Sequence, residues 1–224
     1  ARYLIGADGA NSAVRRLAIG GGAQHGAMAI EGLLSHEHCR RYPETTFDLG
    51  AVPDGYGWLF PKGDHVNVGL YVRTQSGAKV DRDALAAYAM TRLGSDELTH
   101  VQGFTLGTWG HRQRLAAGRV LLVGDAAGFT EPLLGEGIYG AVLSGQRAAA
   151  AILAGADVAA DYIADMRRWS GELKRVHPLA AMFYATLPLS FGVLKHLVRP
   201  HLMAGYAAGL TLGQSKRLYW GARF

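Results

Sequence analysis

A chain of 224 residues, of which 49% are hydrophobic, can bury the core of one large domain or two small ones, which excludes a disordered chain. The formal net charge of +5 is scattered without a basic stripe, so we expect no nucleic-acid partner. A single cysteine excludes an internal disulfide framework and predicts a reducing, cytoplasmic location.

The first elements in chain order are a short strand at residues 2–6 and a helix that begins after Ser12. Ser12 precedes Ala13-Val14-Arg15 and is placed as a helix N-cap. The chain begins inside the apolar run of the strand, with no loop before it. We therefore expect this chain to be a piece of a longer protein.

Strand patterns dominate residues 26–75. They cover 27–35, 45–52, 56–61 and 65–72, and the last two flank the turn Lys62-Gly63-Asp64 as a hairpin. Alternation places Val66, Val68 and Leu70 on one face. Trp58 and Phe60 alternate with Gly57 and Leu59, so they share one face of their strand. Two interpretations of this pair stay open: core packing, or the wall of an apolar cavity.

Residues 81–93 have the pattern of an amphipathic helix, and residues 103–110 that of another strand. Residues 119–123 then form a continuous apolar run, typical of a strand covered on both faces. Asp125 follows Gly124 directly after this strand, at the end where ligands bind in α/β sheets. The two residues are equally compatible with a plain turn.

A loop containing Pro132 leads to Gly135, Glu136 and Gly137, and the helix predicted over residues 138–153 begins at Ile138. Glycines at a helix start leave backbone amides uncovered at the positive end of the helix dipole. Together with a carboxylate for sugar-like hydroxyls, this predicts a site for a flavin. Its ribityl hydroxyls would meet Asp125, and the N1/O2 edge of its ring would meet the amides near Gly137 and Ile138.

The glycines at 135, 137 and 140 also match G-x-G-x-x-G, the fingerprint of dinucleotide-binding folds. That fingerprint must follow its strand directly and lead to a second strand. Here a loop intervenes and the predicted helix is followed by more helix, so we reject this interpretation.

Three motifs in order resemble a known family. Residues 5–12, Ile-Gly-Ala-Asp-Gly-Ala-Asn-Ser, resemble the Asp-Gly flavin motif of the flavoprotein hydroxylase superfamily, and Gly124-Asp125 with its loop and helix resembles that superfamily's second FAD motif. Residues 56–61, Tyr-Gly-Trp-Leu-Phe-Pro, resemble the Tyr-x-Trp-x-Phe-Pro signature of geranylgeranyl reductases. The chain is thus identified as a member of the geranylgeranyl reductase family, similar to it over residues 1 to about 155.

The resemblance implies FAD as cofactor and a fold of α/β class with α+β character. It implies a partial FAD-binding domain at 1–20 and 117–155, a β-rich substrate domain at 21–116 with an antiparallel sheet, and a helical region at 156–224. The amino-terminal unit that holds the ADP half of FAD is expected to be missing. The isolated chain is then an oxidoreductase fragment that could be inactive.

The resemblance also implies residue roles. The residues implied to bind FAD are Asp8, Gly9, Gly124, Asp125, Pro132, Gly135, Gly137 and Ile138. Tyr56, Trp58 and Phe60 are implied to line the site of an isoprenoid lipid or another apolar small molecule, and a reduced electron donor is required. No catalytic residue is singled out. An aromatic monooxygenase, a halogenase and a non-catalytic fragment remain alternatives.

Two further features carry open interpretations. Cys39 lies beside His36 and His38, but an incidental surface cluster is favoured over a metal site or a reactive thiol. The uncharged runs 178–194 and 202–213 are bracketed by basic residues. They predict either a buried helical hairpin or peripheral contact with a membrane, and they fit a spanning segment less well.

Overall fold

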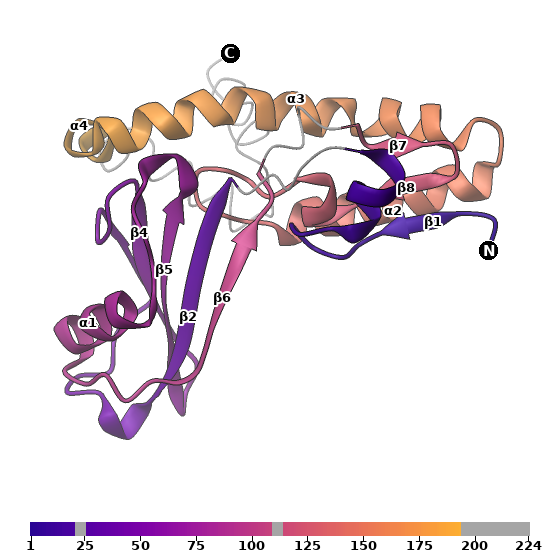
Figure 1. The fold of residues 1–224 in the computed structure, drawn as a ribbon. Coiled ribbons are helices and arrows are strands. Elements are labelled where there is room, and N and C mark those ends of the chain that lie inside the picture. The colour runs from indigo at the N-terminus through magenta and orange to yellow at the C-terminus, as the bar shows by residue number, and fades with distance from the viewer. Residues whose placement is uncertain (21–25, 109–113, 194–224) are drawn as a thin grey trace, which may run out of the picture. The chain divides into compact units, whose positions relative to one another are not determined.

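The computed structural model describes residues 1–20, 26–108 and 114–193. The chain divides into two units, 1–180 and 181–224, and both sheets belong to the first (Figure 1). The mixed α and β content confirms the predicted fold class. The first unit contains two separate sheets, and the predicted division into FAD-binding and substrate parts stays a prediction.

The larger sheet has five antiparallel strands. They are β2 (Ala27–Ser35), β3 (Thr46–Leu49), β4 (Gly55–Pro61), β5 (His65–Arg73) and β6 (Thr99–Leu106), in the order β3-β4-β5-β2-β6. The first four match the predicted strands closely. The strand predicted at 103–110 instead begins at Thr99, and residues 109–110 lie outside the described part of the chain.

One face of this sheet is covered by α1 (Arg82–Leu93) (Figure 1). The helix begins where the Asp81 side chain accepts a hydrogen bond from the Ala84 amide and ends at Gly94, which is left-handed at φ 81°. Its fully buried Leu85 packs in one apolar cluster with Val66, Val68 and Leu70, as the predicted alternation required. The pattern of period two therefore oriented the sheet correctly.

The smaller sheet joins two segments that lie far apart in the sequence. β1 (Leu4–Gly6) pairs in parallel with β8 (Val120–Leu122), and β8 pairs antiparallel with β7 (Ala116–Ala117). Ile5 lies opposite Leu121. The two-residue strand β7 is too short for a sequence pattern to reveal.

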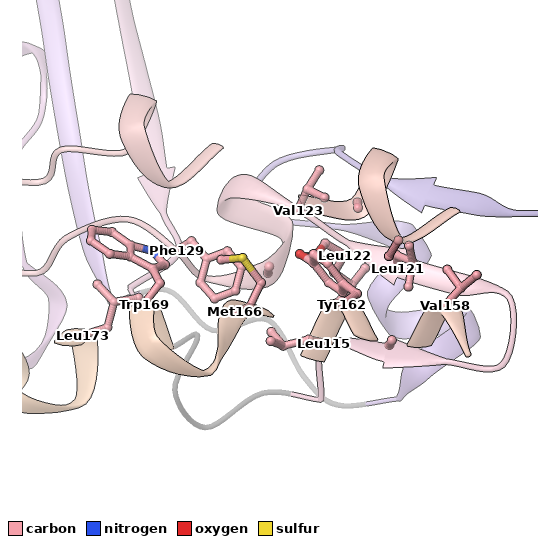
Figure 2. Close-up of a cluster of buried hydrophobic side chains, with 14 residues drawn as sticks. Leu115, Leu121, Leu122, Val123, Phe129, Val158, Tyr162, Met166, Trp169 and Leu173 are labelled. Atoms are coloured by element: carbon pink, nitrogen blue, oxygen red, sulfur yellow. The ribbon is translucent and has the colours of Figure 1, made fainter. Parts of the chain in front are cut away.

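Two helices, α2 (Ile138–Ala154) and α3 (Val158–Ala185), pack on this sheet. Figure 2 shows the shared core, in which Tyr162 and Met166 of α3 meet Leu121 and Leu122 of β8. The Tyr162 ring is fully buried, and its hydroxyl donates to the Leu122 carbonyl at 2.5 Å. This bond uses a carbonyl that a three-stranded sheet would otherwise leave unpaired.

Shorter helical segments complete the described chain. They are η1 (Arg15–Ile19), η2 (His36–His38), η3 (Thr74–Ser76), η5 (Gly124–Ala127) and α4 (Leu187–Val193). Among the described residues no single helix has the length and hydropathy to cross a membrane, although α3 and α4 pass together as a pair bent by 112°. The second uncharged run, 202–213, lies outside the described residues.

Candidate functional site

The turn after β8 is fixed to α2 by a buried hydroxyl. Gly124 has φ 54°, a conformation that glycine adopts without strain, and its amide donates to Ser144 Oγ at 2.9 Å. Ser144 is fully buried, and its own hydroxyl donates to the Gly140 carbonyl at 2.6 Å. A Cβ on Gly140 would lie 2.4 Å from the Phe129 carbonyl oxygen, so only glycine permits this approach of helix and turn.

Asp125 lies beside the beginning of α2, as predicted. A Cβ on Gly137 would be 3.2 Å from Asp125 Oδ1, so the carboxylate lies close to the backbone at the beginning of α2. The carboxylate also holds its own surroundings together: Oδ1 accepts from Thr130 Oγ1 at 2.5 Å and Oδ2 accepts from the Gly107 amide at 3.3 Å. Asp125 is therefore half-buried and internally bonded, while retaining lone pairs for a ligand hydroxyl.

The segment from 130 to 137, called here the connecting loop, is hydrogen-bonded to the larger sheet. Tyr56 donates its hydroxyl to the Leu134 carbonyl at 2.6 Å, and Tyr71 donates to the Pro132 carbonyl at 3.0 Å. Gly135 has φ 73°, and a Cβ there would lie 2.7 Å from the Tyr71 ring. Pro132 and Gly135 thus have packing roles, and Tyr71 is a contributor that the sequence did not single out.

The amino-terminal end of α2 is the most available donor group at this site. Within the described part of the chain, its cap residue Gly137 makes no side-chain cap, and the Tyr139 amide donates to Glu136 Oε1 at 2.8 Å. The amides of Gly137 and Ile138 have no intrahelical acceptor at this end of a helix. They can therefore bind an anionic or polarised oxygen next to Asp125.

The Asp-Gly motif forms a tight turn ahead of η1. Asp8 accepts from Ser12 Oγ at 2.5 Å and from the amides of Ala13 and Val14 at 2.7 and 3.1 Å. Burial opposes ionisation of Asp8, but these hydrogen bonds outweigh it and hold the pKa of the carboxyl below its usual value. Gly9 has φ 76°, and a Cβ there would meet nothing within 4 Å, so the backbone is open to a ligand.

Arg15 joins this motif to the turn after β8. Its side chain is 2% exposed, and its guanidinium donates to the carbonyls of Ala10 at 2.6 Å and Ala126 at 2.9 Å. Ser12 Oγ accepts from the Arg15 amide at 2.9 Å, which confirms the predicted N-cap. The two predicted flavin motifs, 111 residues apart at this contact, are therefore neighbours in space.

Tyr56, Trp58 and Phe60 share one face of the larger sheet, the aromatic face. Centroids of successive rings are 6.0 Å apart, and Phe47 of β3 joins Phe60 at 5.2 Å. A Cβ on Gly69 would lie 1.9 Å from the Trp58 ring, so this glycine lets the indole lie across β5.

Cys39 offers no activated thiol. Its Sγ donates to the Ser35 carbonyl at 3.5 Å, and burial raises the pKa of the thiol above its usual value. The part of the chain that the structure describes contains no group of three or more His, Cys, Asp or Glu side chains that could hold a metal ion.

The bond between Asp125 and Thr130 predicts a measurable coupling. We expect Asp125→Ala and Thr130→Val each to lower the free energy of unfolding by about 1–3 kcal/mol, because each leaves a partner unpaired. The double variant should lose less than the sum, by about 1 kcal/mol, in a denaturation cycle. Strictly additive losses would show that this hydrogen bond does not hold the connecting loop.

The geometry fits the ribityl and ring portions of a flavin: uncapped helix amides, a carboxylate beside them and an open glycine turn. The FAD binding domain family model matches residues 1–155. The chain is 34% identical over 181 residues to a chloroplastic geranylgeranyl diphosphate reductase of Oryza sativa subsp. japonica, covering 78% of this chain and 39% of that one.

Two solved structures share the fold. A geranylgeranyl bacteriochlorophyll reductase-like protein from Thermoplasma acidophilum aligns with a TM-score of 0.61 and 25% identity over 83% of this chain and 50% of its own. The flavin-dependent brominase Bmp2 aligns with a TM-score of 0.63 at 19% identity, over 92% and 56%. The chain spans 39% of the length of the Oryza sativa relative and 50% and 56% of the lengths of the two solved structures. It belongs to the FAD binding domain family, as a flavoprotein of the hydroxylase-like fold with geranylgeranyl reductases among its relatives.

Proposed function

We propose that this chain belongs to an FAD-dependent reductase that saturates double bonds of isoprenoid lipids. It would contribute part of the FAD-binding domain and most of the substrate domain. FAD is the cofactor of the family, and relatives named geranylgeranyl diphosphate reductase support the substrate class. The observation that carries the proposal is the aromatic face, whose Tyr56 also bonds the connecting loop at the flavin site. An apolar substrate lying on this face would lie next to the cofactor.

The polar atoms of the aromatic face are used inside the protein. Trp58 Nε1 donates to Asn67 Oδ1 at 2.6 Å, and the Tyr56 hydroxyl is engaged by Leu134. Tyr56 and Trp58 are 6% and 8% exposed and Phe60 is half-buried, so the face consists of closely packed ring surface whose polar atoms are engaged. Affinity on such a surface comes from buried apolar area, which suits a prenyl chain better than a phenol or another hydroxylated aromatic.

FAD reduced by an external electron donor would supply a hydride, and saturation of each double bond would also need a proton. The residues of this chain have supporting tasks. Asp125 would accept hydrogen bonds from ribityl hydroxyls, and the amides of Gly137 and Ile138 would stabilise negative charge at the N1/O2 edge of the ring. The aromatic face would exclude water from the substrate side.

A monooxygenase or halogenase is the second candidate. The brominase fold supports this alternative at the level of architecture alone, since its 19% identity extends no further. The reaction, not the fold, separates the two.

Geranylgeranyl diphosphate incubated anaerobically with the protein, FAD and dithionite should gain one H₂ per reduced double bond, measured by mass spectrometry. Reduction of the prenyl chain is the expected outcome because the aromatic face has the chemistry of an alkyl site. Hydroxylation or halogenation of an aromatic substrate in air, with no prenyl reduction, would transfer the proposal to the second candidate.

Trp58→Ala should weaken binding of a geranylgeranyl substrate by about 1.5–3 kcal/mol, because ring area buried against the chain is lost. A geranyl substrate, which covers less of the face, should lose much less, and FAD affinity should stay near its original value. Trp58→Phe is the matched control and should restore most of the KM. Equal losses for both prenyl lengths would identify Trp58 as a packing residue only.

A further inference from the structure

Glu131 uses every polar atom it has to close the connecting loop on itself. Its amide donates to the Glu136 carbonyl at 2.7 Å, and its carbonyl accepts from the Gly135 amide at 3.0 Å. Its two carboxylate oxygens accept one amide each, from Leu133 and Leu134, both at 2.8 Å. The residue is only 7% exposed, so these four bonds form an internal frame for the loop.

The frame and the larger sheet hold opposite sides of the same backbone. The amides of Leu133 and Leu134 point to Glu131, while the carbonyls of Pro132 and Leu134 accept from the two sheet tyrosines. A buried segment without helix or strand needs other hydrogen-bond partners for its amides and carbonyls. These bonds supply the partners in one conformation of the loop. The connecting loop ends at Gly137, where α2 begins and its first amides face the expected flavin site.

We propose that Glu131 is a positioning residue for the flavin: its carboxylate fixes the connecting loop so that the amino-terminal amides of α2 face the cofactor. The inference uses the FAD-binding character of the family and does not depend on the substrate proposed above. It assigns a task to a buried acid whose carboxylate bonds to amides of the connecting loop.

The protonation state of Glu131 controls the frame. Burial, with a smaller contribution from the Glu136 carboxylate, raises the pKa of this carboxyl to about 7 against the opposing effect of the two amides. The other ionisable groups on the elements packed around the loop are Tyr56 on β4, Tyr71 on β5 and Asp125 on η5. When ionised, Glu131 accepts both amides. When protonated, one oxygen carries a hydrogen that opposes an amide donor.

Loop order and global stability should therefore respond to pH in opposite directions. The frame is complete above about pH 7 and weakens as pH falls through this value. Because the folded-state pKa is raised above the unfolded value, the contribution of Glu131 to stability is present in acid and is lost as pH rises through about 7. A general loosening of the fold would move both quantities the same way.

The test is FAD titration of the protein by flavin fluorescence from about pH 5.5 to about pH 8.5, a range over which Glu131 changes charge. Wild-type affinity should increase at least about threefold across this range, with a midpoint near the pKa of about 7. E131Q should bind FAD several-fold more weakly at high pH and show no such midpoint, because Gln offers one acceptor and opposes the second amide.

E136Q is the matched control in the same loop. It should keep the pH dependence and move its midpoint to lower pH, because one negative charge beside Glu131 is removed. Thermal unfolding keeps the E131Q result interpretable: the variant must melt cooperatively, and its Tm should fall less than that of wild type as pH rises. The titrations use the full-length protein, which includes the expected amino-terminal unit. The proposal is overturned by a pH-independent FAD affinity of that protein or by the same pH dependence in E131Q.

Discussion

The connecting loop has to satisfy its backbone polar groups without the help of a helix or a strand. It crosses from the turn after β8 to the beginning of α2, with Glu131 7% exposed and Thr130 fully buried. Buried amides and carbonyls without hydrogen-bond partners lower the stability of the fold. The path of such a segment therefore depends on which groups supply those partners. Glu131 supplies partners from inside the loop, Tyr56 and Tyr71 supply them from the larger sheet, and the Gly107 carbonyl accepts from the Thr130 amide.

This constraint makes the cofactor site and the aromatic face interdependent. Tyr56 contributes its ring to the face and its hydroxyl to the loop, so the two sites share one side chain. The proposed substrate on the face would contact the residue that holds the connecting loop. The glycines follow from the same crowding, since Gly135 accommodates the Tyr71 ring and Gly137 accommodates Thr130 and Asp125. Their place in the motif that resembles a flavin motif and their packing role are therefore compatible explanations.

The sequence predicted elements whose signals are local. The hairpin with Val66, Val68 and Leu70 on one face was expected from alternation, and α1 from the amphipathic pattern of residues 81–93. It could not show that Tyr71 reaches the loop, because that contact joins residues 61 positions apart. Glu131 gave no signal either: its role depends on burial, and a glutamate beside a proline looks like a surface loop residue. The limit is tertiary contact and not local propensity.

The interdependence of loop and sheet is tested most directly by Tyr56→Phe, which removes one hydroxyl and leaves the ring on the aromatic face. FAD affinity measured by flavin fluorescence should fall about five- to tenfold, as expected for one buried hydrogen bond whose carbonyl partner is left unpaired. Binding of a prenyl substrate through the face should change little in comparison. An unchanged FAD affinity in a stably folded Tyr56→Phe variant would contradict the account, because the loop would then hold its position without the sheet.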